Sequence, residues 1–118
     1  MSSGKAIAQA GHAFLGTFLN SVDRYPDLAA AYGQLNPGTK ITLDGGSGKA
    51  LERLHDKLIF SGHPCSLIID KDHIELPDFD GSPVITALGV GPISRADAKK
   101  LLGKFALWPD AKGKGGAP

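Results

Sequence analysis

The sequence predicts an α/β fold: a three-layer sandwich in which a small mixed sheet carries helices on both faces. Three observations support this class. Two short apolar runs, CSLIID at 65–70 and VITALGV at 84–90, have the continuous hydrophobicity of strands buried on both faces. Amphipathic segments with helical spacing separate the predicted strands. The order strand, helix, strand over 39–70 forms a βαβ unit, for which a right-handed crossover is expected.

The chain of 118 residues has the size of one domain around one hydrophobic core. We expect a single α/β domain over residues 1–108 and a flexible, basic, glycine-rich tail over 109–118. No apolar run approaches the roughly 18 residues of a membrane span, and no basic segment followed by an apolar one opens the chain. We therefore expect neither a membrane association nor a signal peptide.

The first predicted helix runs from Lys5 to about Val22, and Ser2 or Ser3 can cap its start. Apolar side chains at helical spacing predict one buried stripe: Ile7, Phe14, Leu15, Phe18 and Val22. At about 100° per residue, a second stripe lies on roughly the opposite side: Lys5, Gln9, His12 and Gly16. This second stripe is either a surface that contacts a partner or the solvated face of an amphipathic helix, and periodicity does not distinguish the two.

The next elements come in the order helix, strand, helix. Pro26 can open a second helix that reaches about Leu35, where the turn Asn36-Pro37-Gly38 ends it. TKITLD, residues 39–44, alternates as a strand does. Residues 49–60 then predict an amphipathic helix with Ser47 as a possible cap.

The carboxyl-terminal half contains the two apolar strands and one more helix. The single cysteine, Cys65, excludes an intrachain disulfide, which suits a reducing cytoplasm. Its position in the apolar run 65–70 predicts a buried thiol rather than a reactive one. After the strand at 84–90, Ser94 is a good N-cap for a last helix that we expect to extend through Trp108.

The net charge is only +1, but the charges are unevenly distributed. From Arg95 onward six basic residues accompany two acidic ones, whereas five acids lie between Asp70 and Asp80. A basic carboxyl-terminal face can attract phosphates. Composition alone favours the simpler interpretation, a solvated helix face followed by a tail.

Two kinds of site are not supported by the motifs. DGGSGK at 44–49 resembles a phosphate loop, but Leu43 stands where its first glycine is required and Ala50 replaces the hydroxyl residue that would hold magnesium. We interpret it as a strand-to-helix connection. The four histidines are scattered, with no i, i+4 pair and no CxxC, so no metal site is predicted.

Lys5 and Asp70 form the most informative pair of charged residues. A lysine in the first turn of a helix faces the positive end of the helix dipole, where a cation is unfavourable. Asp70 ends a predicted strand, at the sheet edge where α/β proteins place their sites. The residues alone leave two interpretations open: a joint site, or a surface lysine and a strand-end aspartate that never meet.

Three segments resemble one known family. GKAIAQAGHA (4–13), CSLIIDKDHIEL (65–76) and VITALGVGPISRADAKKLLGKFALW (84–108) are similar to the archaeal and eukaryotic-type peptidyl-tRNA hydrolases, with the same order of elements. The resemblance implies hydrolysis of the ester that joins a peptide to the 3′ ribose of tRNA, without metal or cofactor. It also implies a cytoplasmic enzyme that is commonly a homodimer.

The resemblance assigns roles to residues that match the family motifs. The helix-start lysine of the family falls on Lys5, its strand-end aspartate on Asp70, and the threonine before its LGIGP segment on Thr86. By this resemblance Asp70 activates water, Lys5 stabilises the oxyanion and Thr86 contacts the ester or the terminal nucleotide. The implied substrate-binding residues are Gln9, His12, Lys49, Arg53, Lys99 and Lys100.

The chain also departs from the family pattern. Ile74 stands where the family has a threonine, and Lys71-Asp72 replaces a small Ala-Gly pair. The strand that precedes the first helix in the family has no counterpart ahead of Met1. These departures leave an alternative to the enzyme: a member of the family with impaired turnover that binds RNA or a protein partner.

Overall fold

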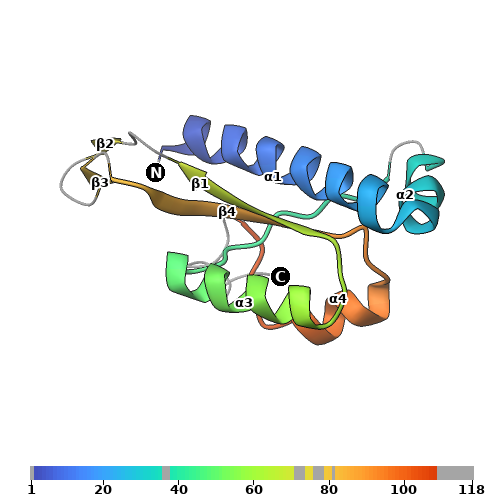
Figure 1. Cartoon of the computed structure of the whole chain (residues 1–118). Helices are drawn as coiled ribbons and strands as arrows, with labels where there is room; N and C mark the ends of the chain where they lie inside the picture. Colours follow the sequence, from blue (N-terminus) through green and yellow to red (C-terminus); the bar gives the residue numbers. More distant parts are fainter. Residues whose placement is uncertain (1, 36–37, 71–73, 76–78, 81, 109–118) are drawn as a thin grey trace.

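Two helices cover one face of a central pair of antiparallel strands and two helices cover the other (Figure 1). The computed structural model describes residues 2–35, 38–70, 74–75, 79–80 and 82–108. The predicted tail at 109–118 and the turn residues Asn36 and Pro37 lie outside the described residues. The three-layer α/β class is confirmed.

The helices begin where the sequence places their caps. Helix α1 spans Ser3–Arg24, α2 Pro26–Gly33, α3 Gly48–Phe60 and α4 Arg95–Leu102. The side chains of Ser2, Ser47 and Ser94 each accept a backbone N–H of the first turn that follows. No helix in the described part of the chain is both long and apolar enough to cross a bilayer.

The sheet is smaller than the sequence predicts. Strand β1, Cys65–Asp70, pairs antiparallel with β4, Val84–Val90, and a short hairpin pairs β2, Ile74–Glu75, with β3, Phe79–Asp80. The ranges 65–70 and 84–90 match the predicted strands. Because both described pairings are antiparallel, the prediction of a mixed sheet and a βαβ unit is wrong in this respect.

The predicted strand at 39–44 is also wrong. This segment makes a single bridge, between Leu43 and Leu107, and does not join the β1–β4 pair. Its backbone bonds go to the segment after α4: the Asp44 N–H donates to the carbonyl of Ala106 (2.8 Å). The last helix therefore ends at Leu102 rather than Trp108, because the residues that follow turn back to meet residues 42–44.

The apolar core lies between the sheet and the α3–α4 layer. Leu54 and Leu58 of α3 pack with Cys65 of β1, and all three are buried. Partly buried side chains from the opposing elements complete this cluster: Leu88, Val90, Leu101, Leu102 and Phe105. The prediction of a buried Cys65 is confirmed, and burial raises the pKa of its thiol.

Helix α1 packs on the other face of the sheet through small and polar side chains. Its buried residues are Gln9, Ala13, Thr17 and Ser21. A methyl group on Gly89 of β4 would fall onto the carbonyl of Ala13, and one on Gly16 would meet the Ser66 side chain. Helix and strands are thus too close for large side chains between them.

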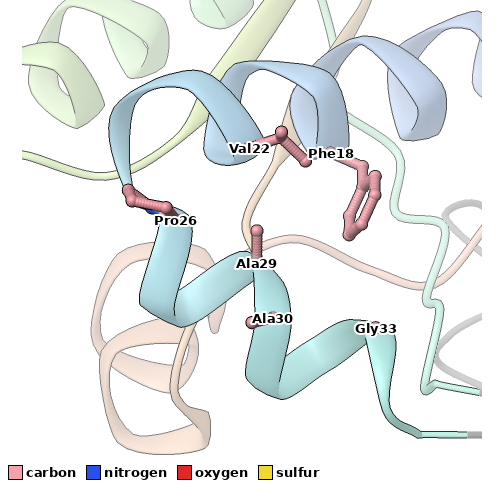
Figure 2. Close-up of a pocket in the computed structure, with 6 residues that line it drawn as sticks. All are labelled: Phe18, Val22, Pro26, Ala29, Ala30 and Gly33. Atoms are coloured by element: carbon pink, nitrogen blue, oxygen red, sulfur yellow. The ribbon is translucent and has the colours of Figure 1, made fainter.

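The predicted buried stripe of α1 is therefore wrong. Ile7, Leu15 and Val22 are 71%, 60% and 49% exposed, because the small-residue face is the one that fits the sheet. Helix α2 covers only part of the apolar face, where Phe18 contacts the ring of Tyr32. The two helices enclose an apolar pocket of about 300 Å³ (Figure 2), lined by Phe18, Val22, Pro26, Ala29, Ala30 and Gly33.

Candidate active site

The candidate site lies where α1 begins and β1 ends. Ser2 accepts the Lys5 N–H (3.2 Å), which fixes the first turn of α1, and that turn contains no acidic residue. The Nζ of Lys5 contacts Oδ2 of Asp70, the last residue of β1, at 2.7 Å. Asp70 therefore supplies the negative charge that the amino end of a helix favours, and it balances the unfavourable positive charge of Lys5 at that position.

This ion pair is partly exposed. The side chain of Lys5 is 36% exposed and that of Asp70 is 18% exposed. A carboxylate partly shielded from water can orient a bound water molecule, while an adjacent ammonium group can stabilise negative charge that develops on an oxygen. The arrangement thus places a proton acceptor, the Asp70 carboxylate, beside a hydrogen-bond donor, the Lys5 ammonium group, that can stabilise an oxyanion.

A β-bulge lies next to this pair and contains Thr86. Ile68 pairs with Ala87 and Ile69 pairs with Ile85, so Thr86 is the extra residue on β4. Its hydroxyl donates to the carbonyl of Ile68 at 3.4 Å, two residues before Asp70. Bulges near sheet ends redirect side chains, and this one places a hydroxyl near the strand end that carries the carboxylate.

The other predicted α1 residues occupy different environments. Gln9, one turn after Lys5, is buried and faces the sheet, whereas His12 is exposed. Gly16 lies against Ser66. The stripe that includes Lys5, Gln9 and Gly16 is therefore mainly a packing surface, and it brings Lys5 to Asp70 because the same face of the helix meets the sheet.

The predicted basic residues lie in the opposite layer. Lys49 and Arg53 are exposed on α3, and Lys99 and Lys100 are exposed on α4. Helix α3 begins near the candidate site, because Gly48 packs against Ile85, whose strand partner Ile69 precedes Asp70. The structure thus brings Lys5, Asp70 and Thr86 to one end of the sheet, with Lys49 in the first turn of the helix below.

Comparison with known proteins shows which family this chain is related to. The model of the family described as "Peptidyl-tRNA hydrolase PTH2" matches residues 1–108. The chain belongs to the PTH2 family of peptidyl-tRNA hydrolases. The match confirms the resemblance found in the sequence and supports the predicted class of reaction, hydrolysis of a peptidyl-tRNA ester.

Curated PTH2-like proteins from archaea show the same relationship over most of their length. A peptidyl-tRNA hydrolase of Methanocaldococcus jannaschii is 31% identical over 108 residues, covering 91% of this chain and 89% of that protein. One from Halobacterium salinarum is 32% identical, covering 92% and 89%. One from Pyrobaculum aerophilum is 33% identical over 113 residues, covering 92% and 88%.

Two features of this PTH2 member bear on the predicted departures. Ile74 lies in β2, and Lys71 and Asp72 lie outside the described residues.

Among the residues that the structure describes, no group of three or more His, Cys, Asp or Glu side chains is placed to hold a metal ion. The sequence assigned no role to His63, which lies between α3 and β1 and whose side chain contacts Asp97 of α4 at 3.4 Å.

Proposed function

We propose that this chain hydrolyses the ester bond between peptide and tRNA, and that Lys5 and Asp70 form its catalytic pair. The observation that carries the proposal is the 2.7 Å contact between these two partly exposed side chains. Membership of the PTH2 family supports the substrate class.

The proposed reaction uses the two groups in sequence. Asp70 accepts a proton from a water molecule as the water oxygen attacks the ester carbonyl carbon. Lys5, together with backbone N–H groups at the start of α1, stabilises the negative charge on the carbonyl oxygen. The intermediate collapses by breaking the bond to the ribose oxygen, which takes up the proton held by Asp70, and the free peptide and tRNA leave.

The remaining predicted residues bind the substrate in this proposal. Thr86, at the bulge two residues along β4 from the Asp70 partner Val84, donates a hydrogen bond to the ester or the terminal nucleotide once it releases the carbonyl of Ile68. His12, which is exposed, extends the site along α1, whereas Gln9 is buried against the sheet and supports the helix that carries Lys5. Four exposed cations contact the tRNA backbone: Lys49, Arg53, Lys99 and Lys100. Because these are phosphate contacts, affinity should fall steeply with salt.

We also propose that the chain acts as a homodimer in the cytoplasm, where translation generates peptidyl-tRNA. The exposed apolar face of α1 supports the dimer. Ile7, Leu15 and Leu19 are 71%, 60% and 56% exposed on this helix, and Leu19 follows Phe18, which lines the pocket shared with α2. Several exposed large apolar side chains on one helix are typical of an interface.

The proposal is tested by release of peptide from purified N-blocked aminoacyl-tRNA. Asp70→Asn and Lys5→Ala should each lower the rate by about 100-fold or more. Asp27→Asn and Lys40→Ala, exposed charges away from the site, are matched controls and should leave the rate unchanged.

Stability measurements separate catalysis from folding in the same variants. The ion pair is partly exposed, so its loss should lower the free energy of unfolding by less than about 1 kcal/mol. Wild-type protein that binds tRNA at low salt but releases no peptide would contradict the proposal and indicate a binding module instead.

A further inference from the structure

The carboxyl-terminal end of α3 exposes an aromatic side chain almost completely. Phe60 is 94% exposed, the highest value among the large apolar residues that the structure describes as exposed. A phenylalanine left in water gives up roughly 1.5–3 kcal/mol of burial free energy, so its exposure on a helix requires a reason. Neither the candidate active site nor the apolar core uses this ring.

The helix end that holds Phe60 is well ordered by its own hydrogen bonds. The Ser61 N–H and Oγ donate to the carbonyl of Lys57 at 3.0 and 2.8 Å, and the His63 N–H donates to the carbonyl of Leu58 at 3.0 Å. These bonds satisfy carbonyl groups that a fraying helix end would leave open. Phe60 is therefore presented on a rigid support.

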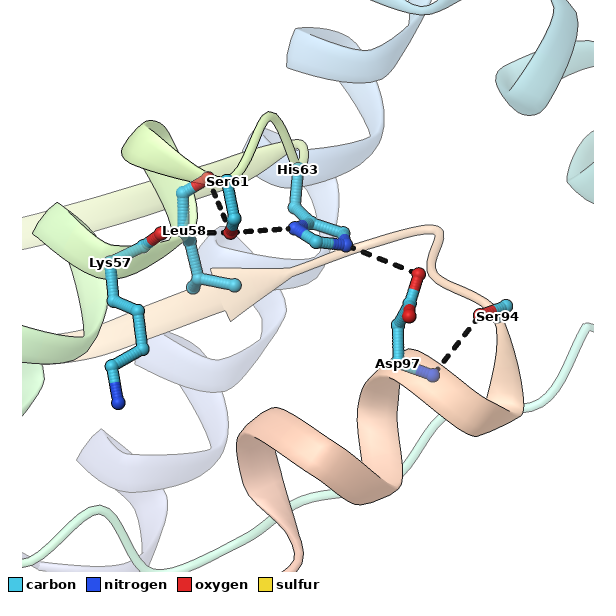
Figure 3. A network of polar contacts seen from close by, with 6 residues as sticks. All are labelled: Lys57, Leu58, Ser61, His63, Ser94 and Asp97. Atoms are coloured by element: carbon cyan, nitrogen blue, oxygen red, sulfur yellow. Dashed lines mark hydrogen bonds and ion pairs between the residues drawn. The ribbon is translucent and has the colours of Figure 1, made fainter.

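A side-chain network fixes the same end of α3 to α4 (Figure 3). Ser61 Oγ lies 3.0 Å from Nδ1 of His63, and Nε2 of His63 lies 3.4 Å from Oδ2 of Asp97. Asp97 belongs to the first turn of α4, where its own N–H donates to Ser94. The network connects the segment that follows α3 to the helix that carries the basic residues Lys99 and Lys100.

Cations share the outer face of α3 with this ring. At about 100° per residue, Lys49, Arg53, Lys57 and Phe60 fall within an arc of about 80°. All three cations are exposed, with Arg53 near the centre of the arc; Glu52 and Asp56 lie beyond its Lys49 edge, so the face of α3 around Phe60 carries three cations against two acids. Ile59, the other exposed apolar residue at this end, points about 100° away from Phe60.

A row of cations with one exposed aromatic ring fits single-stranded nucleic acid. Phosphates pair with the cations, and a base stacks on the ring regardless of its identity. A protein or lipid partner would require apolar neighbours around Phe60, whereas the residues on its face of α3 are charged.

The direction of α3 relates this surface to the candidate active site. The helix begins where Gly48 meets Ile85, at the end of the sheet that holds Asp70, and its axis carries the chain away from that end (Figure 1). Phe60 lies twelve residues farther, about 18 Å along the axis. That distance corresponds to about five stacked bases at 3.4 Å each.

We propose that Phe60 is a stacking anchor for an unpaired base of the RNA substrate, with Lys49, Arg53 and Lys57 holding the phosphates that lead from it toward the catalytic pair. The inference rests on the proposed function for the identity of the RNA. It adds a base contact distant from the scissile bond.

Binding measurements test the anchor with deacylated tRNA and with a single-stranded RNA oligonucleotide, by fluorescence anisotropy at several salt concentrations. Phe60→Ala and Phe60→Leu should weaken binding about 5- to 100-fold, and Phe60→Trp should retain it, because only an aromatic ring stacks. The slope of log affinity against log salt should stay unchanged in the Phe60 variants. Lys57→Gln should lower the slope by about 0.7 to 0.9, the value of one phosphate contact. Ile59→Ala is the matched control and should behave as wild type.

Kinetics distinguish failure of this inference from failure of the proposed function. In peptide release, Phe60→Leu should change KM more than kcat, and KM should rise. Asp70→Asn should instead lower kcat. Equal RNA affinity of Phe60→Leu and wild type would overturn the anchor even if hydrolysis is normal. Loss of self-association or of vesicle binding in Phe60→Leu, with RNA affinity unchanged, would also overturn it. Absence of hydrolysis in wild type, with the Phe60 effect on RNA binding intact, would leave the anchor standing and reject the esterase.

Discussion

At the scale of single residues, Lys5 shows how a locally unfavourable choice becomes favourable in the fold. A lysine in the first turn of a helix meets the positive end of the dipole. Asp70 removes that conflict, because its carboxylate lies 2.7 Å from the Lys5 Nζ. Local rules that fail in a sequence often mark functional sites, which agrees with the catalytic role proposed for this pair.

Cys65 yields a prediction about pH at the same scale. Burial raises the pKa of its thiol, so the unfolded chain loses the proton at a lower pH than the folded chain does. Stability should therefore be complete below the ordinary thiol pKa of about 8.5 and should decrease as the pH rises above it. Urea denaturation between pH 7 and 10 measures this slope.

Two controls accompany the cysteine prediction. Cys65→Ala should be less stable at pH 7 but should show a weaker decrease at alkaline pH. A thiol reagent should modify Cys65 at least about ten times more slowly in the folded protein than in urea. Rapid modification of the folded protein would show that the thiol is accessible.

At the scale of elements, the contact between α1 and β4 depends on glycine. A methyl group on Gly89 would collide with the Ala13 carbonyl, and a helix backbone cannot move away without disturbing the sheet contact. Gly89→Ala should therefore lower the free energy of unfolding by about 1–3 kcal/mol. Gly11→Ala, on the same helix but facing open space, should raise it by about 1 kcal/mol.

Denaturation midpoints of these two variants give the comparison directly. The opposite signs arise because one glycine provides room for packing and the other only adds freedom to the unfolded chain. A neutral Gly89→Ala variant would mean that α1 and β4 are farther apart than described.

At the scale of the whole molecule, the exposed face of α1 predicts self-association. Leu15→Glu and Leu19→Glu place charges on the apolar face and should shift the proposed dimer to monomer, as measured by light scattering during size-exclusion chromatography. Ile41→Glu is the control: Ile41 is 61% exposed but lies on a different segment, so its substitution should leave the dimer intact. A wild-type monomer at every concentration tested would contradict the proposal.

The same scale shows how far the sequence specifies the fold. Caps and apolar runs located all four helices and both long strands, because their signals are local: Ser47 bonds within its own turn, and the run 84–90 is hydrophobic throughout. Pairing is not local. The alternation at 39–44 predicted a strand, but the backbone of this segment hydrogen-bonds to residues 106–108 instead. No periodicity in either segment could indicate that pairing.

By itself the sequence determined the starts of the helices, the two long strands, the family and the catalytic candidates, since caps, runs and motifs are written in consecutive residues. Tertiary structure decided which face of α1 is buried, because close approach of Gly89 and Ala13 admits only small side chains. It also decided that Lys5 and Asp70 meet, because the packing of α1 on the sheet places the amino end of α1 beside the last residue of β1, two segments that lie far apart in the sequence.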